Sequence, residues 1–271
     1  IQMLEEDGLL EDTIVIVIAD HGRDMVRAKF ALYDDGIHIP LVVRIPEKYQ
    51  PEGYEAGGVC DEVVSGVDMM PSILATLGID IPDDLPGVPF FGPDRSEREF
   101  AFAHRDRVGS HLDRSRAVVT KKYHYVRNFM PEQPGYWPAS LYRDFEIAYD
   151  GILDQMLELR AEGKLTPEQE EVVAETRPAE ELFDLENDPY TMHNIADDPE
   201  HLDALRQMRT ALRRWIADTQ DKGFIGEDPA EAAKGAWVVP LWLQLTGGTY
   251  NADDYDVFAL PVDDAFRDML R

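Results

Sequence analysis

Two residues with metal-binding side chains, Asp20 and His21, follow directly after the apolar run of residues 14–19. A run of apolar, mostly β-branched residues without polar alternation is typical of a strand that is covered on both faces in a parallel sheet. In open α/β sheets, ligands bind beyond the carboxyl ends of the strands, which is where these two residues fall. A carboxylate and an imidazole, with Gly22 allowing close backbone approach, could therefore share one metal ion. The same tripeptide also occurs in ordinary turns, where Asp20 would cap the next segment.

A second candidate site is a concentration of positive charge in a chain that is otherwise acidic. The chain of 271 residues has 54 acidic and 26 basic side chains, and its formal net charge is −28. Seven of the basic residues fall within residues 104–127: Arg105, Arg107, Arg114, Arg116, Lys121, Lys122 and Arg127. This cluster predicts a small anionic ligand, or else a solvated basic hairpin. The overall charge argues against nucleic acid or an anionic membrane surface as a partner, and no stretch reaches the ~20 apolar residues of a membrane span.

The residues before position 80 show helical and strand patterns in turn. Residues 14–19 and 41–43 are apolar throughout and predict strands. Asp68 is a suitable N-cap for a helix over residues 69–77, which Gly78 would end. This order of elements favours part of a doubly wound α/β domain.

A different pattern begins after residues 80–94, where four prolines and two glycines mark a boundary. Residues 117–119 and 123–126 predict a hairpin, and residues 181–185 predict another short strand. Apolar residues recur at helical spacing over residues 201–219, which predicts an amphipathic helix. The second region is therefore expected to be α+β, a small antiparallel sheet backed by a helix.

Several segments resemble, in the same order, motifs of the sulfatase family within the alkaline phosphatase superfamily. They are Asp20-His21-Gly22 with Lys29, residues 32–36 and residues 39–43; residues 67–74, similar to a D-x-x-P-T-L-L helix; the basic hairpin 116–129; and residues 181–194, similar to an ELYDLxxDPxExxNLA segment. Together these matches cover residues 1 to about 220. The run from His104 to Arg107 ahead of the hairpin makes the resemblance strongest to bacterial members similar to heparan N-sulfatases.

The resemblance implies the C-terminal part of a doubly wound mixed sheet of the alkaline-phosphatase type, followed by a small α+β subdomain with an antiparallel sheet and a long helix. Residues 1–94 would be the remainder of the α/β catalytic domain, residues 95–220 the subdomain, and residues 221–271 an aromatic C-terminal extension. The first residues would be the last turns of a helix that began upstream.

The resemblance also implies a mechanism and a role for three residues. In the family, a formylglycine made from a Cys or Ser in a C/S-x-P-S-R motif attacks the sulfur atom. A bound divalent cation, usually calcium, lowers the cost of negative charge on the sulfate oxygens. Asp20 and His21 match the second pair of metal ligands. Lys29 matches the lysine that holds the sulfate and can serve the leaving oxygen.

Three further residues are candidates for binding the substrate. His104, Arg105 and Arg107 could bind the carboxylate or sulfate groups of a sugar through charge-assisted hydrogen bonds. The alternative for these side chains is ion pairing with the acidic surface of the protein itself. The expected partner is thus a sulfated small molecule or glycan.

The departures from the family pattern concern the nucleophile and half of the metal shell. The chain contains no C/S-x-P-S-R motif and no Asp-Asp pair after a first strand, and its only cysteine, Cys60, has no proline nearby. We therefore expect the C-terminal part of a sulfatase, whose partner is the missing N-terminal half of the catalytic domain. Alone it should bind metal poorly, because two ligands fall short of the six to eight oxygens that calcium prefers. Cys60 itself is expected to be a buried structural thiol.

Two alternative functions remain open. His21 stands where many relatives have Asn, and because imidazole suits zinc or manganese better than calcium, a phosphonate or phosphodiester hydrolase of the same superfamily is one of them. The other is a non-catalytic fragment that binds sulfated glycans through the basic hairpin.

Overall fold

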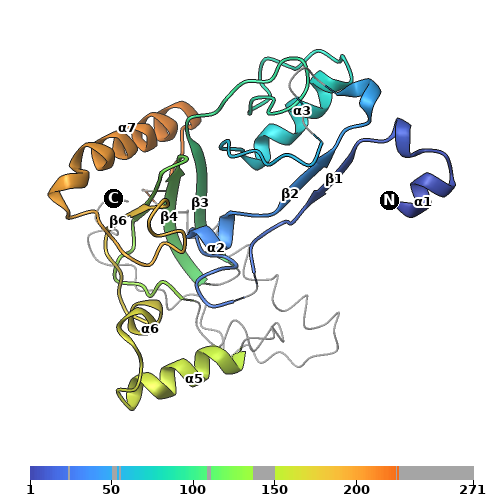
Figure 1. The fold of residues 1–271 in the computed structure, drawn as a ribbon. Coiled ribbons are helices and arrows are strands. Elements are labelled where there is room, and N and C mark those ends of the chain that lie inside the picture. The colour runs from blue at the N-terminus through green and yellow to red at the C-terminus, as the bar shows by residue number, and fades with distance from the viewer. Residues whose placement is uncertain are drawn as a thin grey trace, which may run out of the picture.

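The computed structural model describes residues 1–23, 25–50, 54, 56–108, 111–136, 150–223 and 225 (Figure 1). Its elements, with 3₁₀ helices labelled η, are α1 (Gln2–Glu6), η1 (Leu10–Asp12), β1 (Val15–Ile18), α2 (Asp34–Ile37), β2 (Leu41–Arg44), η2 (Glu47–Tyr49), η3 (Gly66–Asp68), α3 (Met69–Thr76), β3 (Ala101–Val108), β4 (His111–Val119), β5 (Tyr123–Asn128), α5 (Asp150–Ala161), α6 (Pro167–Val172), β6 (Glu180–Asp184), η4 (Pro199–His201) and α7 (Leu202–Thr219). This α/β part followed by an α+β part confirms the predicted fold class.

Strand β1 forms at the predicted position, but its pairing differs from the prediction. It pairs antiparallel with β2, so that Val15 lies opposite Arg44 and Ile18 opposite Leu41. Val17 is 59% exposed, so the described residues do not cover both faces of the strand. The prediction of a parallel, doubly covered strand was therefore wrong for this pair, because an apolar run indicates which residues avoid water and not the direction of the neighbouring strand.

Helix α3 begins directly after Asp68 and ends close to Gly78, as predicted, although the Asp68 side chain makes no capping hydrogen bond to α3 itself. The side chain of Asp68 accepts a hydrogen bond from the backbone N–H of Ser65 at 2.8 Å, in a capping box at η3 that leads into α3. Gly78 then leaves the helix with a φ of +67°, a left-handed conformation that glycine adopts without a steric penalty. Asp68 is also buried and pairs with Arg98, so it links α3 to the chain that enters the second sheet.

The second part is a four-stranded antiparallel sheet in the order β3-β4-β5-β6, with α7 along one face (Figure 1). Val118, Tyr125 and Leu182 on this face form a core with Leu205 and Met208 of α7. Successive residues of a strand point to opposite faces, so each neighbour of these core residues faces away from the helix. The sheet backed by an amphipathic helix was correctly predicted.

The opposite face of the same sheet packs against the segment that follows Asp20 and His21. Ala117, Val126 and Phe183 on this face form a second core with Leu32 and Tyr33. The first part of the chain is thus anchored on the second part by the residues just after Lys29.

Three further expectations from the sequence concern Cys60, membrane-spanning helices and the C-terminal extension. Cys60 is exposed and not buried, because it lies in a loop beside Val59, which is itself 89% exposed. Within the described residues no helix is long and apolar enough to cross a membrane. Most of the expected extension 221–271, and the side chain of Arg107, lie outside the residues that the structure describes.

Candidate active site

Asp20 and His21 form a turn at the end of β1 and place two potential metal ligands side by side. The Nε2 atom of His21 lies 3.5 Å from Oδ1 of Asp20, and the two side chains are 38% and 87% exposed, respectively. Nδ1 of His21 donates a hydrogen bond to the carbonyl of Gly22 at 2.7 Å. Because Nδ1 donates in this contact, Nε2, the atom next to the carboxylate, is the ring nitrogen that is left to bind a metal ion.

The turn requires glycine at position 22. The backbone N–H of Gly22 donates to the carbonyl of Gly36 at 3.0 Å. A Cβ atom added at Gly22 would overlap the carbonyl oxygen of Asp35 and lie 2.9 Å from Cα of Gly36. The close backbone approach expected from the sequence is therefore present, and the approaching element is α2.

The donor set fits part of a divalent metal site. A carboxylate oxygen is a ligand for calcium, manganese or zinc, whereas an imidazole nitrogen suits manganese or zinc better than calcium, which prefers oxygen. Among the residues that the structure describes, no group of three or more His, Cys, Asp and Glu side chains could hold a metal ion. Asp20 and His21 could therefore supply two ligands of such a site, and their binding of a metal stays a prediction.

Lys29 lies in a loop that folds back beside this turn. Its backbone N–H donates to the carbonyl of Arg23, two residues after His21, at 2.9 Å. Its side chain is half-buried, with Nζ 5.2 Å from the centroid of the Phe30 ring. Two residues of this loop, Arg27 and Phe30, have φ values of +65° and +68°. Non-glycine residues in the left-handed region are strained and cluster at functional sites.

The structure separates the predicted substrate-binding residues His104 and Arg105. His104 is exposed on the face of the sheet that carries α7, and its ring lies 6.2 Å from that of Trp215. Arg105 points to the other face, where it is buried and its Nη1 donates to the carbonyl of Phe30 at 2.6 Å. Of these two residues, only Arg105 therefore reaches the loop that carries Lys29, and it reaches the backbone of this loop.

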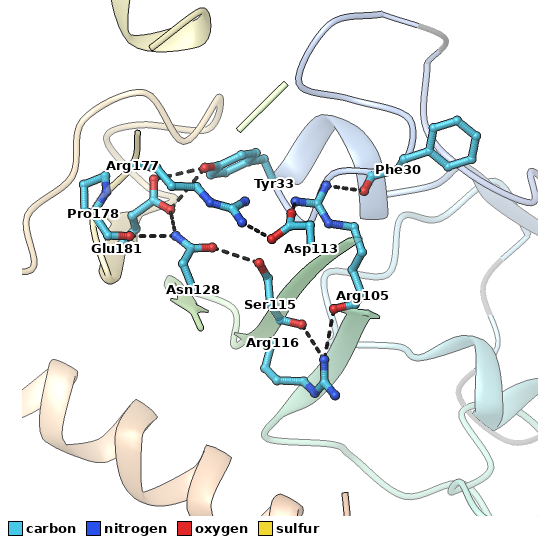
Figure 2. A network of polar contacts seen from close by, with 10 residues as sticks. All are labelled: Phe30, Tyr33, Arg105, Asp113, Ser115, Arg116, Asn128, Arg177, Pro178 and Glu181. Atoms are coloured by element: carbon cyan, nitrogen blue, oxygen red, sulfur yellow. Dashed lines mark hydrogen bonds and ion pairs between the residues drawn. The ribbon is translucent and has the colours of Figure 1, made fainter. Parts of the chain in front are cut away.

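A buried polar network surrounds Arg105 and was not predicted from the sequence (Figure 2). Asp113 pairs with both Arg105 and Arg177, so two guanidinium groups share one buried carboxylate. Asp113 and Arg105 belong to the basic stretch seen in the sequence. The only sequence signal for the pairing was an acidic residue within that stretch.

The network continues to Tyr33 on the loop that follows Lys29. The Tyr33 hydroxyl donates to the Glu181 carboxylate, with both oxygens at 3.1 Å. Asn128 donates to the same carboxylate at 2.7 Å, and Ser115 donates to the Asn128 side-chain oxygen at 2.9 Å. Burial raises the pKa of Tyr33 to about 12 and also raises the pKa of Glu181. Tyr33 is thus a neutral hydrogen-bond donor that fixes this loop to β6.

Comparisons with known proteins show the family to which this chain belongs. The family model described as "Sulfatase" matches residues 1–79, which include Asp20, His21 and Lys29. An ulvan-active sulfatase of Formosa agariphila is 36% identical over 228 residues, which cover 84% of this chain and 37% of that protein. Human N-sulphoglucosamine sulphohydrolase is 26% identical over 84% of this chain and 46% of its own length. The chain belongs to the sulfatase family.

Solved structures show the same fold. A 2-O GAG sulfatase superposes with a TM-score of 0.58 and 18% sequence identity, over 85% of this chain and 42% of that one. The chain therefore spans less than half of the length of each of these relatives.

Proposed function

We propose that this chain is the part of a sulfatase that supplies two metal ligands and the sulfate-binding lysine, for the hydrolysis of sulfate esters or sulfamates on a glycan. One observation carries the proposal. The Asp20–His21 pair and the loop of Lys29 lie together at the end of β1, in the segment that the sulfatase family model matches. Such a site would combine a metal-binding pair with a cation that suits a tetrahedral anion.

The roles of the three residues follow from their donor atoms. Asp20 and Nε2 of His21 would hold the metal, most simply Ca²⁺ as in the family, with Mn²⁺ or Zn²⁺ as the alternatives that the imidazole favours. When bound, the cation would supply positive charge beside the sulfate oxygens. The ammonium group of Lys29 would donate hydrogen bonds to the sulfate and offer its charge to the leaving oxygen.

The rest of the active site would come from the N-terminal half of the catalytic domain. That half would carry the remaining metal ligands and the formylglycine, for which this chain has no C/S-x-P-S-R motif. The apolar side chains of Val17 and Val42, 59% and 61% exposed on the β1–β2 ribbon, offer a surface for it. We expect the 271-residue chain to be inactive without this partner.

The names of the relatives support a saccharide substrate. They refer to ulvan, to N-sulphoglucosamine and to a GAG 2-O position, which are all carbohydrates. The alternative of a glycan-binding fragment without catalysis is weaker. Lys122, one of the two lysines at the tip of the basic hairpin, is engaged with Glu186 at 2.9 Å.

The second candidate function is hydrolysis of phosphonates or phosphodiesters. It is favoured by one observation, the imidazole of His21 in the ligand pair, because nitrogen ligands suit zinc or manganese. The two functions differ in the charge and geometry of the group transferred, so their substrates separate them.

The test is turnover of 4-nitrophenyl sulfate and of bis(4-nitrophenyl) phosphate by the full-length protein. We expect faster turnover of the sulfate, and a loss of about 10²-fold or more in kcat for Lys29→Ala, because the variant lacks the charge at the leaving oxygen. Lys48→Ala is the matched control, since Lys48 is an exposed lysine that pairs with Asp12 far from this turn. Preference for the phosphodiester, or full activity of Lys29→Ala, would refute the proposal.

A further inference from the structure

The backbone conformation of the Lys29 loop depends on contacts from outside the loop. Arg27 and Phe30 both adopt left-handed φ values, which L-residues with side chains rarely populate. Such conformations persist only where the surrounding structure imposes them. The contacts that impose them here come from the second sheet and the turn after β6.

Each of the two left-handed residues is held by an arginine. At Arg27 the residue's own side chain fixes the backbone. Its Nη2 donates to the carbonyl of Thr191 at 2.7 Å, and its guanidinium lies 3.5 Å from the centroid of the Tyr33 ring. Phe30 is held through its carbonyl, which accepts a hydrogen bond from Nη1 of Arg105. Lys29 lies between these two anchors.

Arg105 is itself fixed on both sides (Figure 2). Its Nη2 pairs with the buried carboxylate of Asp113, which also binds Arg177. Its backbone carbonyl accepts a hydrogen bond from Nη1 of the fully buried Arg116 at 3.1 Å. A guanidinium that is 7% exposed and ion-paired in this way is a poor ligand for a substrate, but a rigid support for a backbone carbonyl.

We propose that Arg105 is a positioning residue for Lys29, acting through the Phe30 carbonyl, so that the second sheet sets the geometry of the sulfate-binding lysine. This inference rests on the proposed function of Lys29. It replaces the direct substrate contact expected for Arg105 from the sequence, and it assigns the buried Asp113–Arg177 pair the task of holding Arg105.

The first test needs no catalytic activity. Hydrogen exchange is measured for the backbone amides of residues 25–31 in the 271-residue chain, for the natural protein and for Arg105→Lys and Arg105→Gln. Lysine keeps the positive charge beside Asp113 but lacks the forked guanidinium that binds Asp113 and Phe30 together. We expect the loop amides to exchange about tenfold faster in both variants, while the amides of α7 in Arg105→Lys stay protected.

The second test is kinetic and uses the full-length protein with 4-nitrophenyl sulfate. A displaced lysine lowers the rate of the chemical step, so kcat should fall about 10- to 100-fold in Arg105→Lys with KM within about twofold. Arg206→Gln is the matched control, because Arg206 is an exposed arginine that pairs with Asp203 at 3.0 Å. It should leave loop exchange and kcat unchanged.

The outcomes separate the positioning role from the proposed function. Unchanged loop exchange in Arg105→Lys, or a rise in KM with kcat unchanged, would overturn the positioning role and indicate direct contact with substrate. Faster exchange of α7 together with the loop would overturn it too, because the effect would then be general unfolding. If the loop loosens as expected but the natural full-length protein hydrolyses no sulfate ester, the anchoring by Arg105 stands and the sulfatase function fails.

Discussion

Gly22 is the residue on which the geometry of the candidate metal pair depends. Its Cα lies so close to α2 that a methyl group would overlap the carbonyl oxygen of Asp35. For Gly22→Ala we expect the free energy of unfolding to fall by about 1–3 kcal/mol, as in other overpacked sites, because backbone atoms and not a flexible side chain must move. Urea unfolding of the 271-residue chain measures this change.

The matched control is Gly66→Ala. Gly66 begins η3, and a Cβ atom there would meet no atom within 4 Å. Its unfolding midpoint should stay near that of the natural chain. Equal stability of the two variants would contradict the close contact between Gly22 and α2.

At the residue scale, the sequence was sufficient to single out candidate residues within one turn. It was not sufficient to find residues that are distant in sequence and contact one another only in the folded chain. Asp20, His21 and Gly22 are neighbours in sequence, so a single motif was sufficient to find them. The role of Arg105 depends on Phe30, which is 75 residues away. Neither composition nor periodicity encodes such a contact, and the same is true of the exposure of Cys60.

At the scale of elements, the sheet β3-β4-β5-β6 has two differently used faces. One face packs on α7, and this layer was predicted because apolar residues recur along the helix with a clear period. The other face carries the segment that follows Lys29, and this layer was not predicted, because residues 31–33 have no periodic pattern of their own. The antiparallel pairing of β1 and β2 was missed because an apolar run does not indicate the direction of the neighbouring strand.

His124 on β5 joins the second face to that segment and makes the interface sensitive to pH. It is fully buried, and its Nε2 donates to the carbonyl of Leu32 at 2.7 Å. Burial lowers its pKa to about 4, while the bond to Leu32 and the nearby Asp34 oppose this shift and Arg27 and His38 add to it. In the unfolded chain the imidazole takes up a proton below its ordinary pKa of 6.5. Stability contributed by the neutral ring is therefore present at pH 7 and lost as the pH falls from about 6.5 to about 4.

We expect this loss to be about 3 to 4 kcal/mol for the natural chain, because burial lowers the pKa from 6.5 to about 4, at about 1.4 kcal/mol for each unit. His124→Gln should abolish it, because the glutamine amide can still donate to Leu32 but does not titrate. The measurement is urea unfolding at pH 7.0, 5.5 and 4.0 for both proteins. Curves of stability against pH that run parallel for the two would contradict the assignment.

At the scale of the whole molecule, the two parts of the chain are joined through the candidate site. The loop of Lys29 lies between the turn of Asp20 and His21 and the polar network of the second sheet. In a chain with a net charge of −28, the buried arginine side chains face carboxylates or carbonyl oxygens of the protein itself. Two members of the basic stretch seen in the sequence, Arg105 and Arg116, are thus buried internal supports. Arg177, from outside this stretch, shares Asp113 with Arg105.

The fold class could be predicted because strands, helices and glycine signals are local features of the sequence. The candidate metal pair could be predicted because it is a single tripeptide at the end of a strand. The support for Lys29 could not, because it depends on contacts between segments separated by more than 70 residues. Only the folded chain brings these segments together.

The most direct test of the central claim, that Asp20 and His21 hold the metal of a sulfatase site, is the metal content of the full-length protein. After dialysis, elemental analysis would be compared for the natural protein, for the double variant Asp20→Ala with His21→Ala, and for Asp83→Ala, which alters an exposed aspartate in the loop after α3. We expect about one divalent ion per chain in the natural protein and in the control, and little or none in the double variant, because a shell that loses two ligands binds weakly. A double variant that retains the full complement of metal would contradict the claim.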